Sequence, residues 1–275
     1  MTGFSRSNRK RYQGAGMVRK YRDRHGLFPA EERILAEIAP TVRNRPVLDL
    51  GVGAGRTAPH LSALGGSYLG LDYAPRMIEA ARRAYPGLHF ETGDARDLGT
   101  LPTDHFALVF FSFNGIDYID PAGRLQALGE IRRVLAPGGH FVFSSHNAAF
   151  TEPLPWAPSR FVPTRNPLRT LVRLGHYLTG CLHYLALRPQ LREGGDWSLR
   201  VVGERNFSVV AYHIRPAAQI AELETAGFRV SGLNTFPGEP IPAEAVSTGP
   251  DDPPPWIYYV ARKESGSGGF PGRGV

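Results

Sequence analysis

Three glycines stand at alternate positions in the segment VLDLGVGAGRT, namely Gly51, Gly53 and Gly55. They follow an apolar run that is typical of a buried strand and precede a run of helical character. Glycine has no Cβ, so the backbone can turn tightly there and approach a ligand closely. Asp49, two residues before the first glycine, disfavours a pyrophosphate and suits a ligand that carries positive charge. The segment therefore predicts a cofactor-binding turn, in which Asp49 either contacts the ligand or orients the loop.

The spacing of this turn argues against two common nucleotide motifs. A dinucleotide-binding turn requires a small residue where this chain has Arg56, and no Gly-Lys-Ser/Thr sequence follows to make a Walker A loop.

Acidic residues stand near the ends of the next two predicted strands. Asp72 ends the run SYLGLD, 23 residues after Asp49, where an acid favours a ligand role. Asp94 follows the third strand, in ETGDARDL, and either binds a ligand or caps a turn. Met77 lies in the predicted helix between them, at a spacing that suits the core as well as a ligand contact.

Further polar residues follow the fourth and fifth predicted strands. Ligands of open α/β sheets bind beyond the carboxyl ends of the strands, so these residues are candidates for an acceptor pocket. His146 is the first candidate for a general base, because an imidazole can accept a proton near neutral pH. His213 is the second and Asp117 the third. A hydrogen bond to neighbouring backbone is the alternative role for a histidine at a strand end, and no metal site is predicted.

The elements that position these residues predict an α/β fold. Short apolar runs alternate with helical runs and give five strands by residue 145, which implies a parallel sheet with right-handed crossovers. Residues 146–214 interrupt the alternation with a proline-rich run, a helix and a hairpin, and we interpret them as an inserted lid. We expect one domain over 28–263, a basic N-terminal arm and start of a cap over 1–27, mobile at its beginning, and a disordered tail over 264–275.

The segment from Val47 to Asn147, and more loosely to Lys263, resembles the class I S-adenosylmethionine-dependent methyltransferases, small-molecule type, related to the ubiquinone/menaquinone methyltransferases. The matching motifs, in order, are VLDLGVGAGRT, GLDYAPRMIEAAR, ETGDARDL and EIRRVLAPGGHFVFSS. The resemblance implies a Rossmann-like seven-stranded sheet of order 3-2-1-4-5-7-6, with the last strand antiparallel. It also implies S-adenosyl-L-methionine as the cofactor.

The same resemblance implies roles for individual residues. The glycine turn would lie against the methionine part of the cofactor, and Asp72 would accept hydrogen bonds from both ribose hydroxyls. Met77 would pack near the adenine, while Asp94 and the backbone of Ala95 would meet its polar edge. The expected cofactor-binding set is completed by Ser112 after the fourth strand and by Tyr21, which with Tyr12 could fold over the cofactor.

Charge and cysteine content bear on the location of the protein and on what it can bind. The single cysteine, Cys181, excludes an internal disulfide, and we expect a cytoplasmic location. The net charge of +7 is concentrated in residues 6–24, with eight Lys or Arg and one acid, and in 160–205, with eight arginines. Such patches bind nucleic acid, anionic lipid or an acidic substrate, or are simply solvated.

The expected activity is methyl transfer from S-adenosylmethionine to an O, N or C atom of a small-molecule acceptor. Two alternatives are an RNA methyltransferase that uses the basic arm and a non-catalytic, cofactor-binding regulatory module. Nucleic acid is not favoured, because the run DPPPW at 252–256 precedes the final strand, whereas amino methyltransferases of nucleic acids carry a similar run after the fourth.

A predicted helix within 166–187 has leucines on one side and Arg and His on the other. We expect it to pack its apolar side on the domain as a lid. Peripheral contact with a membrane is the alternative. Nothing in the sequence indicates the oligomeric state.

Overall fold

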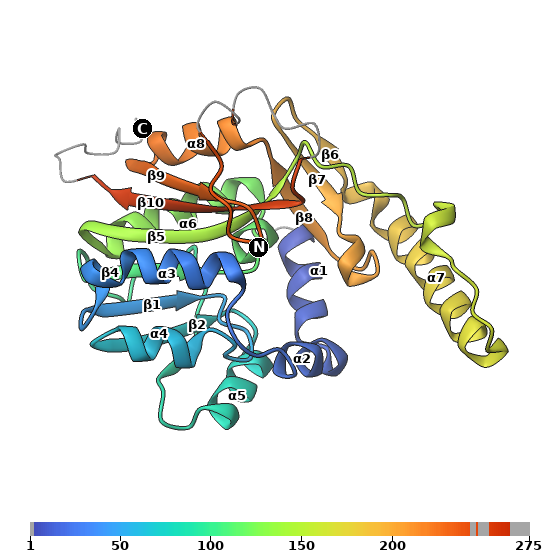
Figure 1. Cartoon of the computed structure of the whole chain (residues 1–275), viewed down its shortest axis with the longest axis horizontal. Helices are drawn as coiled ribbons and strands as arrows, with labels where there is room; N and C mark the ends of the chain where they lie inside the picture. Colours follow the sequence, from blue (N-terminus) through green and yellow to red (C-terminus); the bar gives the residue numbers. More distant parts are fainter. Residues whose placement is uncertain (1–2, 243–245, 247–252, 265–275) are drawn as a thin grey trace.

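The computed structural model of the chain describes residues 3–242, 246 and 253–264. The predicted tail from residue 265 and Asp252 of the proline-rich run lie outside the described residues. A central β-sheet carries helices on both faces, and a long helix extends to one side of it (Figure 1).

The elements alternate as the sequence predicts up to residue 145. The strands are β1 Pro46–Leu50, β2 Ser67–Asp72, β3 Phe90–Thr92, β4 Phe106–Phe111, β5 Leu135–Asn147, β6 Arg192–Glu193, β7 Trp197–Val201, β8 Val210–Ile214, β9 Phe228–Asn234 and β10 Trp256–Lys263. The α-helices are α1 Gly3–Tyr12, α2 Ala15–Arg22, α3 Pro29–Val42, α4 Ala58–Leu64, α5 Pro75–Ala84, α6 Pro121–Val134, α7 Pro167–Leu187 and α8 Pro216–Thr225. Short 3-10 helices are η1 Gly115–Tyr118, η2 Pro158–Arg160, η3 Arg188–Gln190 and η4 Gly203–Arg205.

Seven strands form the sheet that the sequence predicts. β3, β2, β1, β4 and β5 are parallel neighbours, β10 pairs antiparallel with β5, and β9 pairs antiparallel with β10. The predicted order 3-2-1-4-5-7-6 with an antiparallel last strand is confirmed. The carboxyl ends of β1 to β4 consequently meet at one edge of the sheet.

Two apolar layers hold this sheet between helices. Val47 and Phe110 pack with α3 and α4, whereas Leu48 and Val109 pack with α6 and α8 on the opposite face. The alternation arises because successive side chains of a strand point to opposite faces. A shift of one residue would exchange the two faces, so this packing also fixes where the residues beyond each strand end lie.

β5 continues beyond the end of β4, where Phe111 stands opposite Phe143. The last two residues of β5, His146 and Asn147, pair with β8 instead. β8, β7 and β6 are joined by antiparallel pairing, so the described part of the chain forms a sheet of ten strands rather than seven. The hairpin predicted from the sequence is confirmed as β7 and β8, and it brings His213 opposite His146.

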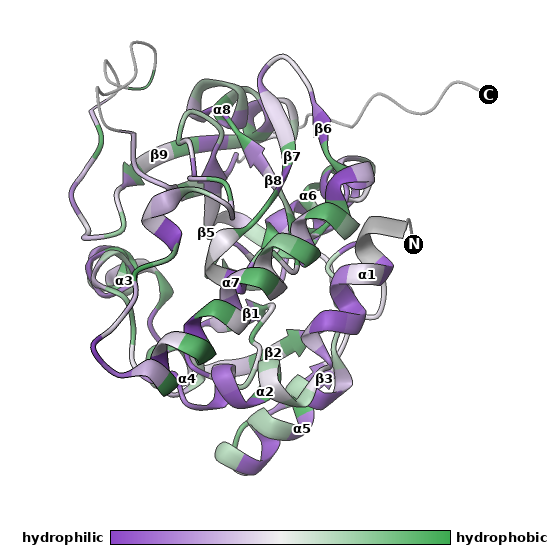
Figure 2. Cartoon of the chain, turned by 90° about the vertical axis from the view of Figure 1, so that its right-hand side faces the viewer, coloured by the Kyte–Doolittle hydropathy of each residue, from purple (hydrophilic) through white to green (hydrophobic). Residues whose placement is uncertain are grey.

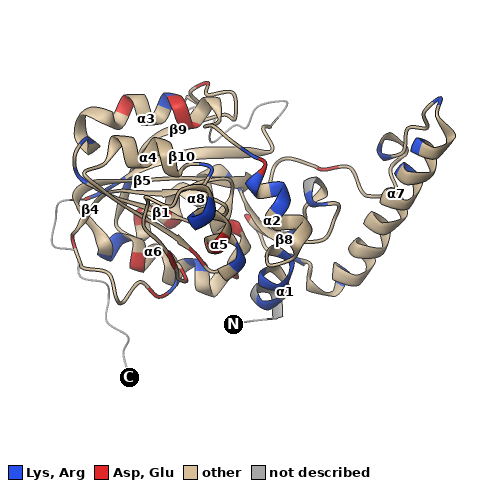
Figure 3. Cartoon of the chain, turned by 90° about the horizontal axis from the view of Figure 1, so that it is seen from below, with Lys and Arg blue, Asp and Glu red and all other residues tan. Residues whose placement is uncertain are grey.

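One side of α7 is apolar and the other polar, as expected, but the apolar side does not pack on the domain. The helix projects from the body (Figures 1 and 3), and its leucines are exposed instead of packed on the domain, as the hydrophobic stretches of α7 in Figure 2 indicate. The expectation of a lid helix with its apolar side against the sheet is therefore wrong in this structure. No helix among the described residues is long and apolar enough to span a bilayer.

The basic N-terminal segment is helical. α1 and α2 carry most of its Lys and Arg (Figure 3). Tyr12 is buried and joins a cluster with Met77 and Tyr118, and the side chain of Asn8 bonds to the backbone of Val210 in β8. A few well-spaced apolar and amide side chains thus anchor a segment whose composition is polar.

Candidate active site

A cleft lies beyond the carboxyl ends of β1 to β4 and encloses about 790 Å³, including its open mouth. Most of the predicted cofactor-binding residues line it, namely Gly51, Gly53, Asp72, Met77, Asp94, Ala95, Ser112 and Tyr21. The structure places Asp49 and Gly55 behind its wall.

The first two glycines give the cleft a bare floor. Gly51 and Gly53 have φ values of +62° and +57°, in the left-handed region that favours glycine. A Cβ on Gly51 would come within 2.6 Å of the ring of Phe111, and one on Gly53 within 3.0 Å of Tyr21. Both rings line the cleft, so the two glycines let them pack directly on a bare backbone at the cleft wall.

Gly55 serves packing rather than ligand approach. Its φ is +93°, and a Cβ there would lie 2.9 Å from the ring of Tyr85 and 3.5 Å from Ala81 on α5. The third glycine therefore lets the turn sit closely on α5.

Asp72, at the end of β2, is aimed at the cleft. Its Oδ2 accepts a hydrogen bond from the N–H of Gly53 at 2.9 Å, and its Oδ1 accepts one from the N–H of Ala74 at 2.8 Å. Burial raises the pKa of Asp72 to about 6, although the two N–H donors oppose that shift. Because a carboxylate has about four acceptor positions, each oxygen can still accept a hydroxyl of a ligand.

Asp49 has a different environment from Asp72. Its Oδ2 accepts hydrogen bonds from the hydroxyls of Thr57 at 2.6 Å and Tyr68 at 3.0 Å. Burial raises the pKa of Asp49 to about 7. Of the two roles left open by the sequence, this geometry favours orientation of the loop, through Thr57 at the start of α4.

Asp94 is held by a partner that the sequence analysis missed. Arg96 grips both carboxylate oxygens, with its Nε 2.9 Å from Oδ1 and its Nη2 2.6 Å from Oδ2. Burial alone would raise the pKa of Asp94, but the hydrogen bonds from Arg96 lower it below the ordinary value. Arg96 also lines the cleft, so the carboxylate is fixed and the adjacent backbone of Ala95 is left for a ligand. The spacing Asp-x-Arg was the available signal.

Ser112 belongs to a buried network that ties the glycine turn to α3. Its hydroxyl bonds to Glu31 and receives a hydrogen bond from Arg56 at 2.8 Å. Arg56 grips both oxygens of Glu31 at 2.7 Å. Arg56, whose size argued against a dinucleotide motif, therefore positions the turn. Glu31 carried no signal in the sequence because its partners lie far away along the chain.

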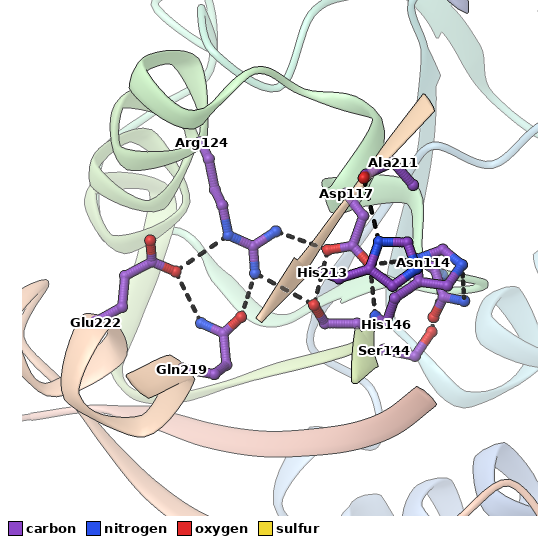
Figure 4. Close-up of polar contacts among 10 residues, drawn as sticks. Asn114, Asp117, Arg124, Ser144, His146, Ala211, His213, Gln219 and Glu222 are labelled. Atoms are coloured by element: carbon purple, nitrogen blue, oxygen red, sulfur yellow. Dashed lines mark hydrogen bonds and ion pairs between the residues drawn. The ribbon is translucent and has the colours of Figure 1, made fainter. Parts of the chain in front are cut away.

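The three predicted catalytic residues lie together at the junction of β5 and β8 (Figure 4), although none lines the cleft. The Nδ1 of His146 is 2.8 Å from Oδ2 of Asp117, and the His146 and His213 rings are 4.7 Å apart. If Nδ1 carries the proton that bonds to Asp117, the other ring nitrogen, Nε2, is an acceptor. That nitrogen lies 3.3 Å from the amide of Asn114, in the loop after β4 that also lines the cleft at Phe113 and Gly115.

Asp117 is unsuited to the role of a base. It is fully buried and accepts hydrogen bonds from Arg124, Ser145, and both the backbone N–H and the ring of His146. Burial alone would raise its pKa, but the hydrogen bond from His146 and the charge of Arg124 lower it. Its geometry is that of a residue that orients His146.

His213 is likewise a poor proton acceptor. Burial, together with the neighbouring His146, lowers the pKa of His213 to about 3. Its Nδ1 lies 3.2 Å from the carbonyl oxygen of Ala211. The alternative role for a histidine at a strand end, a hydrogen bond to neighbouring backbone, therefore fits His213. His146 remains the candidate base.

Aromatic rings from distant segments cover the cleft. Tyr12 and Tyr21 of the N-terminal helices pack edge-to-face, and Tyr12 also packs on Tyr118 of η1. Arg205 of η4 donates a hydrogen bond of 2.6 Å to the hydroxyl of Tyr21, and its guanidinium lies over the rings of Tyr21 and Phe113. We call these five residues the roof.

Comparisons with known proteins agree with this architecture. A family model described as a methyltransferase domain matches residues 47–139. A Mycolicibacterium smegmatis protein named a probable S-adenosylmethionine-dependent methyltransferase is 31% identical over 52% of this chain and 52% of its own length. The demethylmenaquinone methyltransferase of Thermus thermophilus is 37% identical over 35% of this chain and 44% of its own length. The chain thus spans about half the length of these relatives.

A solved structure extends the likeness to most of the chain. It is an S-adenosylmethionine-dependent methyltransferase from Mesorhizobium loti, with a TM-score of 0.54 and 25% identity. The match covers 85% of this chain and 98% of that one.

Proposed function

We propose that this chain, which carries a class I S-adenosylmethionine-dependent methyltransferase domain, moves a methyl group to an O, N or C atom of a small molecule held under the roof. The observation that carries the proposal is the cleft itself. One side is lined by the backbone of Gly51 and Gly53 and by the Asp72 carboxylate, which can accept ribose hydroxyls. Aromatic rings enclose the other side.

The lining of the cleft suits S-adenosylmethionine. The turn at Gly51 and Gly53 presents bare backbone to the cleft, against which the methionine part can lie, and Asp72 can accept both ribose hydroxyls. Apolar side chains, Met77 and Ile119 among them, offer a surface for the adenine. When bound, this cofactor supplies a methyl group already activated by a sulfonium.

The protein therefore has three remaining tasks: to align the acceptor, to exclude water and, for some acceptors, to remove a proton. The roof supports the first two, since its rings are held together by Arg205 and packed against Tyr118. His146 supports the third. Asp117 holds its Nδ1, and the lone pair of Nε2 faces the amide of Asn114, so rotation of the Asn114 side chain would free that lone pair to take up an acceptor proton.

A small acceptor is preferred to RNA because the roof covers the cleft with packed side chains. The relative named as a demethylmenaquinone methyltransferase supports the same choice through its name alone. The basic helices α1 and α2 are the feature that an RNA methyltransferase would use.

The proposal is tested by supplying the protein with methyl-labelled S-adenosylmethionine and separated fractions of a cell extract, one of small molecules and one of RNA. We expect label in the small-molecule fraction and loss of that label with Asp72→Asn. Label confined to RNA and abolished by salt would support the alternative instead. Tight cofactor binding without transfer to any fraction would indicate a regulatory module.

A further inference from the structure

One side of α7 exposes a row of large apolar residues. Each of them lies three or four positions from another, so they share one side of the helix. Their exposed fractions are 73% for Leu168, 65% for Leu171, 74% for Val172, 37% for Leu174, 51% for Leu178, 66% for Leu182 and 53% for Leu185. We call them the outer face of α7. A contiguous apolar surface of this kind on a protein marks an interaction site.

The opposite side of α7 is the one that meets the body. Gly180 is buried against Asn206 and Phe207, and the Nδ1 of His183 lies 2.9 Å from the carbonyl oxygen of Asn206. The ring of Tyr184 also contacts Phe207. Because these contacts fix the rotation of the helix, the outer face points away from the domain, as the helix itself does in Figures 1 and 3.

The surroundings of the outer face are strongly basic. Residues 153–192 contain six arginines and no Asp or Glu. All six arginines, namely Arg160, Arg165, Arg169, Arg173, Arg188 and Arg192, are exposed. The blue segments at the free end of α7 in Figure 3 show that the charge reaches the part farthest from the body.

We propose that α7 binds the surface of an anionic lipid bilayer, with its axis in the plane of the membrane. The leucines of the outer face would enter the boundary between headgroups and acyl chains, and the arginines would meet lipid phosphates. A helix of this length and composition is not apolar enough to span a bilayer, which leaves it lying on one.

Charge favours a membrane over a second copy of the chain. Two copies joined through their outer faces would cover the leucines but leave the arginines of both stretches uncompensated, because the stretch offers no acid. Anionic lipid covers the leucines and neutralises the arginines at once. Membrane binding by α7 does not depend on the proposed methyl-transfer activity.

The test is co-sedimentation of the full chain with phosphatidylcholine vesicles that contain phosphatidylglycerol or lack it. We expect binding to the anionic vesicles that weakens with added salt. Replacing Leu171, Leu178 and Leu182 together by Ser should weaken binding at least about tenfold, because insertion depends on apolar area. Arg165→Gln with Arg169→Gln should lower affinity for anionic vesicles about fivefold per residue and leave binding to neutral vesicles unchanged.

Leu125→Ser is the matched control, since Leu125 is 56% exposed on α6, away from the outer face. Titration with S-adenosylhomocysteine checks that every variant has retained its cleft. The proposal is overturned if the wild type binds neither vesicle or if the triple Ser variant binds like the wild type. It is also overturned if the protein is a dimer in solution that the triple Ser variant dissociates, because the outer face would then be a self-interface.

Discussion

Asp72 and Asp117 are buried carboxylates beyond strand ends of the same sheet, yet their partners differ. Within the described residues Asp72 accepts hydrogen bonds from two backbone N–H groups, and burial raises its pKa to about 6. Asp117 has a guanidinium, a hydroxyl and a histidine around it, and its pKa is lowered in spite of burial. The Asp72 carboxylate can therefore still accept hydrogen bonds from a ligand in the cleft, whereas the Asp117 carboxylate is fully engaged by groups of the protein itself.

The contrast separates two regions. The carboxyl ends of β1 to β4 form a binding region, where polar groups can bind a ligand. The junction of β5 and β8 forms a positioning network that runs from Glu222 through Arg124 and Asp117 to His146 (Figure 4). Substitutions should therefore affect ligand affinity in the first region, and stability or turnover in the second.

The largest effect is expected at Arg124, which has no exposed surface and pairs with Asp117 at 2.8 Å and Glu222 at 3.0 Å. Arg124→Met removes the cation and leaves both carboxylates in place, so the free energy of unfolding should fall by about 3–5 kcal/mol. Denaturant titration measures this change. Arg22→Met is the control, because the pair of Arg22 with Asp23 is exposed and contributes at most about 1 kcal/mol. Equal losses in the two variants would remove the distinction between the regions.

His146→Gln should lower kcat about a hundredfold or more for an acceptor that must lose a proton, because the proposed base is absent. The change in kcat with pH that an imidazole base produces should disappear together with the rate. His60→Gln, on the exposed surface of α4, is the control and should leave kcat unchanged. A His146→Gln enzyme with an unaltered pH profile would show that this histidine has only a structural role.

Asp72→Asn should weaken binding of S-adenosylhomocysteine about 10- to 150-fold, since hydrogen bonds to a charged group contribute about 1.5–3 kcal/mol. Calorimetric titration gives the dissociation constant. Asp117→Asn provides the comparison, because that residue lies outside the cleft and should change cofactor affinity little. Similar losses for both variants would mean that cofactor affinity depends on the network as well.

The cofactor affinity of the wild type should also depend on pH. The ionised carboxylate of Asp72 is the binding form, and its pKa is raised to about 6. As the pH falls from 7 to 5, protonation should weaken S-adenosylhomocysteine binding about tenfold. Asp72→Asn should make the affinity independent of pH in this range. A flat profile for the wild type would contradict the role assigned to the carboxylate.

The binding region was predictable because its signals are local. A strand, a turn and a helix place Gly51, Gly53 and Asp72 within short stretches of sequence, and the sheet order brings the strand tips together. Gly55 and Asp49 matched the same motif, but they are used for packing and loop orientation.

The positioning network could not be predicted from spacing. Arg124 forms an ion pair with Glu222, which lies 98 residues away in the sequence. β8 pairs with β5 at His146 only because β5 extends beyond the end of β4. The periodicity of α7 likewise predicted an apolar side but gave no information about what covers it. The contacts of Gly180 and His183 decide only which side of the helix meets the body.

The most direct test of the account is a crystal structure with S-adenosylhomocysteine. We expect both ribose oxygens within about 3 Å of the Asp72 carboxylate and the methionine portion against Gly51 and Gly53. A ligand bound outside the cleft, or ribose hydroxyls turned away from Asp72, would contradict it.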